Sequence, residues 1–94
     1  MAEVHVTASG HRFIPSRISL PKGEPVKLVI YSAAGNHTFT LKESPESPGA
    51  ILTLEVPAGV TQRYTFTPRK ATSYYFFCKE HEAEGMSGTI DVRA

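Results

Sequence analysis

The stretch YYFFCKEHEAEGMSGTIDV, residues 74–92, holds two alternating runs separated by a short polar loop. Alternation places Tyr74, Phe76 and Cys78 on one face of the first run, and Ile90 and Val92 on one face of the second. Such period-2 patterns predict half-buried strands. The loop between them, KEHEAEG, has room for one helical turn at most. This stretch therefore predicts two strands joined by a compact loop.

The same alternation recurs along most of the chain. Apolar and polar residues alternate in the segments 3–8, 25–31, 37–41, 52–56, 60–68, 72–78 and 88–93. Between them lie turn-forming stretches such as PKGEP, SAAGN and ESPESPGA. Seven or eight short strands in so short a chain predict an all-β fold, an antiparallel sandwich of two sheets. We expect residues 1–94 to form a single domain.

Composition excludes several classes of function. The formal net charge of +1 gives no sign of a nucleic-acid partner or an anionic membrane surface. No apolar run has the length of a transmembrane helix. The single cysteine, Cys78, excludes an intrachain disulfide and leaves a buried thiol, a nucleophile or a metal ligand as its role.

Four possible metal ligands converge in the predicted sandwich. His37 starts one strand at an inward-facing position, and Cys78 ends another strand at an inward-facing position. If the two strands are antiparallel neighbours, both residues lie at the same end of the sandwich. His81 and Met86 follow in the loop that leaves Cys78, so they are expected at that end too.

The donor types favour copper over zinc. Sulfur donors combined with imidazole suit either metal. A structural zinc site has four strong Cys or His ligands, and here one of the four donors would be a thioether. Two histidines and one cysteine with a weak axial methionine form a mononuclear electron-transfer copper site.

The loop sequence C-x-x-H-x-x-x-x-M, followed by GTI, resembles the copper loop of the cupredoxins, specifically the plastocyanin and pseudoazurin type. The stretch FIPSRISLPKGEPVKLVIYSAAGNHTF, residues 13–39, is similar to the first half of that family. The resemblance implies an eight-stranded Greek-key β-sandwich and one type 1 copper. His37, Cys78 and His81 would be its equatorial ligands and Met86 its axial ligand.

Two positions depart from the family pattern. Relatives usually have Asn after the first ligand histidine, where it ties the two ligand loops together; here Thr38 follows and Asn36 precedes. Relatives also often have Pro before the second ligand histidine, and here the residue is Glu80. Since Glu80 keeps the backbone N–H that Pro lacks, we expect that N–H to bond the Cys78 sulfur.

The leading functional prediction is a small protein that carries single electrons between redox partners by Cu(I)/Cu(II) cycling. The alternative is a copper-binding module for storage, delivery or resistance. An enzyme with a nucleophilic Cys78–His81 pair is disfavoured, because Met86 would have no role and no oxyanion hole is evident. A copper oxidase would need further ligands, and a binuclear centre would need a second bridging cysteine.

The resemblance also implies where and how such a carrier works. We expect a monomer in a periplasmic or otherwise extracytoplasmic space, with a signal peptide removed. Redox proteins would dock transiently near His81, and Glu80, Glu82 and Glu84 favour a partner with a basic surface. The other two histidines, His5 and His11, are expected to be solvated.

Overall fold

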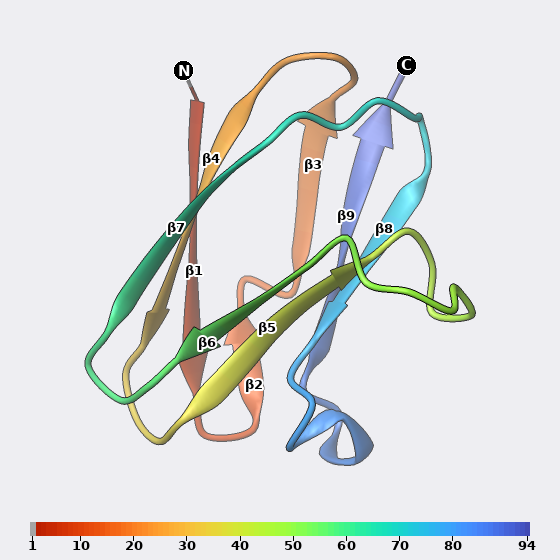
Figure 1. Cartoon of the computed structure of the whole chain (residues 1–94). Coiled ribbons are helices and arrows are strands. Elements are labelled where there is room, and N and C mark those ends of the chain that lie inside the picture. Colours follow the sequence, from red (N-terminus) through yellow and green to blue (C-terminus); the bar gives the residue numbers. More distant parts are fainter. Residues whose placement is uncertain (1) are drawn as a thin grey trace.

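The computed structural model describes residues 2–94 and consists of two β-sheets packed face to face, as Figure 1 shows. The strands are β1 (Ala2–Ser9), β2 (Arg12–Ile14), β3 (Arg17–Pro21), β4 (Val26–Ser32), β5 (His37–Lys42), β6 (Leu52–Val56), β7 (Thr61–Phe66), β8 (Ser73–Phe77) and β9 (Ser87–Arg93). One 3-10 turn, η1 (Glu82–Glu84), lies in the loop between β8 and β9. The predicted all-β sandwich is confirmed, and η1 stays within the limit of one helical turn expected for this loop.

The strand count and directions refine the prediction. One sheet has the order β2-β1-β4-β7 and the other β3-β9-β8-β5-β6. Residues 2–94 form nine strands, because residues 12–21 supply two short ones, one for each sheet, on either side of Pro15. The expectation of purely antiparallel sheets is wrong, since β1 pairs with β4 and β3 with β9 in parallel. Alternation reports which face a residue occupies and carries no information on strand direction.

Aromatic side chains fill the core next to one end of the sandwich. The rings of Phe39 and Phe76 stack with centroids 5.0 Å apart, and Phe13 meets both edge-on at 5.8 and 5.3 Å. All three are buried, and Phe39 and Phe76 are fully so. Phe39 lies two residues after His37, and Phe76 lies two residues before Cys78. Each therefore shares a strand face with a predicted ligand, so the aromatic cluster forms a rigid base below the site.

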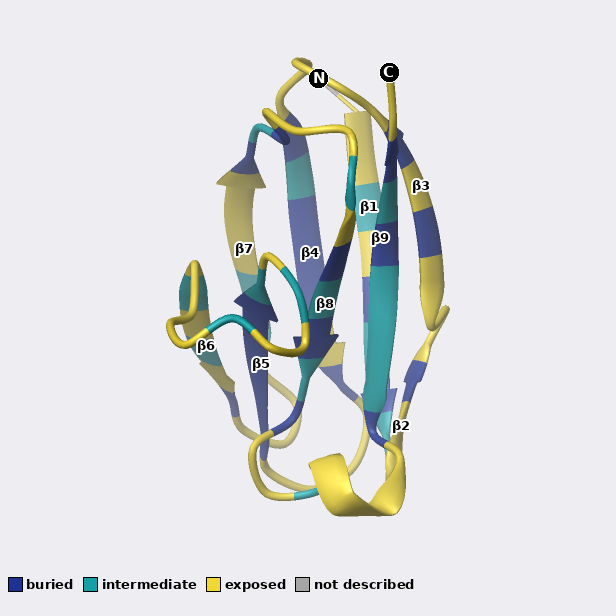
Figure 2. Cartoon of the chain, turned by 90° about the vertical axis from the view of Figure 1, so that its right-hand side faces the viewer, coloured by how far each residue is buried: buried dark blue, intermediate teal, exposed yellow. Residues whose placement is uncertain are grey.

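Strand β5 is buried on both faces, which alternation alone did not predict. Thr38 and Thr40 occupy the face expected to be polar and solvated, yet they are only 8% and 2% exposed. The strand lies in the interior of its sheet, between β8 and β6, and is dark along most of its length in Figure 2. Its hydroxyl groups are therefore available for contacts with neighbouring segments rather than with bulk water.

Four connections lie at one end of the sandwich, the lower end in Figure 1. They are the turn between β1 and β2, the loop 33–36 between β4 and β5, the turn 57–60 between β6 and β7, and the loop 78–86 between β8 and β9. Both chain termini lie at the opposite end. The Ala33 N–H donates to the Ala8 carbonyl at 2.9 Å and fastens the first connection to the second. No helix formed by residues 2–94 has the length and apolar character needed to cross a membrane.

Candidate metal centre

His37 and Cys78 meet because β5 and β8 are antiparallel neighbours. The pairs Thr40 with Phe77 and Leu41 with Phe76 fix the register. The first residue of β5 and the residue that follows β8 consequently lie at the same end of the sheet. The Cys78 Sγ atom is 3.8 Å from Nδ1 of His37, and both side chains are buried. The convergence predicted from strand register is confirmed.

The loop before β5 fixes the orientation of the His37 ring. Nε2 of His37 lies 2.7 Å from the Ala34 carbonyl, which can only accept, so Nε2 carries the proton. Nδ1 is then left with a free lone pair directed toward Cys78. The loop is held by Ser32, whose hydroxyl donates to the Gly35 carbonyl at 2.6 Å. Gly35 has φ of +79°, a conformation that glycine adopts without strain.

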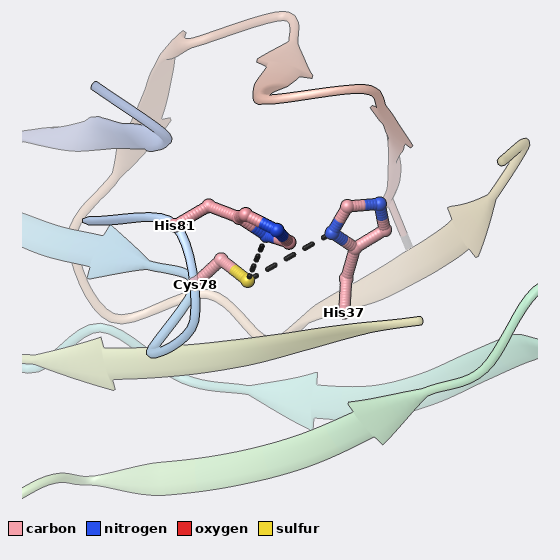
Figure 3. A group of neighbouring side chains, drawn as sticks. All are labelled: His37, Cys78 and His81. Atoms are coloured by element: carbon pink, nitrogen blue, oxygen red, sulfur yellow. Dashed lines mark hydrogen bonds between the residues drawn. The ribbon is translucent and has the colours of Figure 1, made fainter. Parts of the chain in front are cut away.

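The loop after Cys78 returns on itself and carries His81 to the sulfur. The Cys78 N–H donates to the Met86 carbonyl at 3.1 Å, while the His81 carbonyl accepts from the Met86 N–H at 3.2 Å. Nδ1 of His81 lies 3.5 Å from Cys78 Sγ, and Figure 3 shows both imidazoles directed at the sulfur. Met86 is fully buried at the end of the same loop. Backbone hydrogen bonds therefore fold this loop into a compact shape.

The spacing of the donor atoms fits one small metal ion. One donor atom from each of His37, Cys78 and His81 lies within 4.8 Å of the others. Bonds of about 2.3 Å to sulfur and about 2.05 Å to nitrogen, opening at 120°, would separate S and N by about 3.8 Å. The observed separations of 3.8 and 3.5 Å match that value. The sulfur thus already lies at the distance from each imidazole nitrogen that a trigonal site needs.

The Thr38 hydroxyl ties β5, which carries His37, to the loop that follows Cys78. Its Oγ1 accepts from the Lys79 N–H at 3.1 Å and donates to a Glu80 carboxylate oxygen at 2.7 Å. The same oxygen of Glu80 lies 3.3 Å from Cys78 Sγ, while Thr38 Oγ1 is 3.8 Å from that sulfur. The hydrogen bond from Thr38 holds the pKa of the Glu80 carboxyl below its usual range. One hydroxyl thus links β5 to the cysteine loop.

The structure corrects one expectation about the residues around the candidate ligands. Among the hydrogen bonds of residues 2–94, the Glu80 contact to the sulfur comes from the carboxylate and not from the N–H. Thr38 explains the difference, because its hydroxyl draws the carboxylate inward. Asn36 does not reach the cysteine loop, since its Oδ1 accepts from the Ala58 N–H at 3.1 Å. Asn36 therefore fastens its own loop to the turn before β7.

His11 is the residue at this end that the sequence did not assign to the site. It was expected to be solvated in a turn, and its side chain is indeed 57% exposed. Its ring nevertheless stacks on that of His81, with centroids 4.6 Å apart and planes at 29°. Nδ1 of His11 lies 2.6 Å from a carboxylate oxygen of Glu84, in the same loop as His81. Only the tertiary fold brings this turn beside that loop.

Residues 1–92 match the sequence profile of the cupredoxin-like domain. The chain belongs to this family. Three curated relatives also align with it. Quinol oxidase subunit 2 of Sulfolobus acidocaldarius is 28% identical over 98% of this chain and 54% of its own length. The plastocyanin minor isoform of Arabidopsis thaliana is 32% identical over 86% of this chain and 50% of its own. This cupredoxin therefore spans about half the length of those two proteins.

A third relative is similar over most of both chains. Plastocyanin of Sambucus nigra is 26% identical over 85% of this cupredoxin and 86% of its own length. Among solved structures, reduced auracyanin from Roseiflexus castenholzii superimposes with a TM-score of 0.85 at 17% identity. That alignment covers 100% of this chain and 98% of the auracyanin. The fold of this cupredoxin is thus the fold of auracyanin.

The family and the donor set together confirm copper as the predicted cofactor. The chain is a member of the cupredoxin-like family, and the His–Cys–His cluster has the spacing calculated above. Two imidazoles and a thiolate suit copper as well as zinc, and membership of the cupredoxin-like family decides for copper. The predictions of a blue copper protein and of a β-sandwich fold are therefore both confirmed.

Proposed function

We propose that this cupredoxin carries single electrons between redox proteins, with copper held by His37, Cys78, His81 and Met86. The observation that supports this most is the cluster of His37, Cys78 and His81, in which the sulfur lies 3.8 and 3.5 Å from the two imidazole nitrogens and His37 and Cys78 are buried. Met86 would be the axial ligand, because it is fully buried and closes the same loop. When bound, copper supplies a one-electron couple between Cu(I) and Cu(II).

The role of the protein is to hold the ligands in fixed positions while the oxidation state of copper changes. His37 is fixed by the Ala34 carbonyl, and Cys78 is fixed by its N–H bond to Met86. His37 and Cys78 share strand faces with Phe39 and Phe76, whose rings are packed against each other. Since interiors packed in this way resist deformation, ligand positions change little between oxidation states. A small rearrangement is what rapid electron transfer requires.

Thr38, Glu80 and Asn36 support the ligands from outside. The hydrogen bonds of Thr38 to Lys79 and Glu80 hold the cysteine loop against β5. Glu80 places a negative charge 3.3 Å from the sulfur, and that charge favours Cu(II) over Cu(I). Asn36 steadies the loop that carries the carbonyl partner of His37. These three residues are proposed to set the rigidity and the potential of the site.

Partners are proposed to dock at the end of the sandwich that carries His81. Three carboxylates of one loop surround it, and each has a separate hydrogen-bond partner: Glu80 with Thr38, Glu82 with Tyr75, and Glu84 with His11. Because Thr38 and Tyr75 donate neutral hydroxyl groups, their hydrogen bonds leave the negative charges of Glu80 and Glu82 in place. A basic partner is therefore favoured, with association rates that fall as salt rises. The monomeric state and an extracytoplasmic location stay predictions of the family resemblance.

The alternative is a module that stores or delivers copper. Such a module needs an exchangeable Cu(I) site and no reversible couple. The carrier is favoured because the ligand geometry is already assembled in the protein, which slows exchange and assists redox cycling. Catalysis is not proposed for this domain, although one relative is named as a subunit of a quinol oxidase.

The decisive experiment is a Cu(II) titration of the purified protein, followed by visible absorption, EPR and voltammetry. We expect an intense thiolate-to-copper band that saturates at one equivalent, narrow copper hyperfine splitting and a reversible one-electron wave. Cys78→Ser should abolish the band, whereas the matched control His5→Ala should retain it, because the His5 side chain is exposed and its hydrogen-bond partner is Glu3.

Two outcomes would contradict the proposal. A colourless protein with ordinary tetragonal copper would show that Cys78 is not a ligand. A protein that is coloured with Cu(II) and also binds Cu(I), but gives no reversible one-electron wave, would favour the module that stores or delivers copper.

A further inference from the structure

The pairing of His11 with His81 is a second feature at the copper end of the sandwich. His11 follows Gly10, whose φ of +60° makes the tight turn between β1 and β2. The turn is held near the site by the hydrogen bond from Ala33 to the Ala8 carbonyl. The His11 ring is thereby carried onto the face of the His81 ring, at a centroid distance of 4.6 Å.

Glu84 keeps the His11 ring in that position. Its carboxylate oxygen lies 2.6 Å from Nδ1 of His11, and it comes from the same loop as His81. The imidazole is therefore held on one side by a hydrogen bond and on the other by the stack. His11 is 57% exposed in its side chain, whereas His81 is only partly exposed. The outer ring thus meets solvent more fully than the ring beneath it.

A second metal ion between these groups is a weaker interpretation. Donor atoms of His11, His81 and Glu84 do lie within 4.8 Å of one another. The lone pairs of an imidazole lie in the plane of its ring, however, and the two rings are stacked at 29°. Lone pairs of stacked rings run side by side and do not converge on one point. The stacked geometry therefore fits a His11 ring that covers the His81 ring, and not two ligands of one metal ion.

We infer that His11 is a cap over His81, so that a redox partner meets His11 before it meets the ligand imidazole. The inference rests on the proposed function, since it assigns the surface through which that site exchanges electrons. Glu84 is the positioning residue that holds the cap. The cap keeps the partner one ring further from the copper site than direct contact with His81 would allow.

Electron transfer weakens with distance, so removing the cap should speed transfer to a small reagent. We would measure oxidation of the Cu(I) protein by hexacyanoferrate(III) in a stopped-flow instrument. His11→Ala should react several-fold faster than the natural protein, with the reduction potential and the thiolate-to-copper band unchanged. His11→Phe keeps a flat ring over His81 and should react at close to the natural rate. His5→Ala is the matched control, because it removes an exposed histidine that bonds Glu3.

A second measurement does not need copper. Diethyl pyrocarbonate modifies accessible imidazoles, and mass spectrometry can follow the modification of His81 in the metal-free protein. His11→Ala should raise the rate at His81 several-fold, and Glu84→Gln should raise it less. His5→Ala should leave it unchanged.

The two measurements distinguish a wrong inference about His11 from a wrong proposal of electron-carrier function. A natural protein without a thiolate-to-copper band refutes the carrier, and the modification rates then decide the cap alone. Equal rates for His11→Ala and the natural protein in either measurement overturn the cap. Slower oxidation of His11→Ala at unchanged potential also overturns it, because His11 would then conduct electrons rather than restrict access.

Discussion

Replacing Thr38 with Val tests whether one hydroxyl holds the two ligand loops together. Val keeps the branched shape of Thr at this position, which is 8% exposed, but can neither accept from Lys79 nor donate to Glu80. Loss of the acceptor for the Lys79 N–H costs about 1 kcal/mol. Loss of the bond to Glu80 costs about 0.5 kcal/mol, since Glu80 is exposed and water takes the place of the hydroxyl.

The sum, about 1.5 kcal/mol, should be measurable in the metal-free protein. For a domain of this size it corresponds to a fall in Tm of roughly 6–12 °C. Urea denaturation followed by far-UV circular dichroism would give the change in the free energy of unfolding. The second readout is copper affinity, which should fall about tenfold, the lower end of the range for residues that orient metal ligands. Competition with a chelator of known affinity would measure it.

Thr40→Val is the matched control, two residues along the same strand. Thr40 is also buried, but its hydroxyl makes only a 3.5 Å contact with Thr53, at the weak end of hydrogen-bond distances. The control should lose about 0.5 kcal/mol or less, and its copper affinity should not change. If Thr38→Val behaves like Thr40→Val in both readouts, Thr38 does not tie the loops and the reasoning is refuted.

Three further predictions concern the sandwich and its metal. Gly88→Ala would place Cβ 2.4 Å from both the Phe76 ring and the Ser16 carbonyl, so the free energy of unfolding should fall by about 3 kcal/mol or more; Gly49→Ala, where nothing lies within 4 Å, should change it little in the same urea titration. The Ser73 hydroxyl, followed by Arg17, holds the pKa of Asp91 below its ordinary value of 3.8. As pH falls, the Asp91 carboxyl therefore takes up a proton in the unfolded chain before it does so in the folded protein. The free energy of unfolding should exceed that of Asp91→Asn by the full amount at pH 7, and the difference should shrink below pH 3.8. A difference that grows in acid would contradict this. Copper at about a thousand times its dissociation constant should raise the free energy of unfolding by about 4 kcal/mol, a gain that chelation reverses and that is absent in Cys78→Ser.

The positions of the candidate ligands could be predicted from the sequence because strand period and residue spacing act locally. Alternation placed His37 in register with Phe39 and Cys78 in register with Phe76, and the structure has both pairs buried. The short interval from Cys78 to His81 forces both into one loop. Met86 follows in that loop, and its place as axial ligand stays a proposal.

Features that depend on contacts between distant segments could not be predicted in this way. The parallel pairing of β1 with β4 gives no signal in alternation, yet it brings the β1–β2 turn to the copper end. The stack of His11 on His81 and the inward turn of the Glu80 carboxylate follow from that arrangement and from Thr38. Local sequence thus determined the sandwich and the candidate ligands. The packing of segments remote in the chain decided what surrounds and covers them, because such contacts are fixed only when the two sheets close on one another.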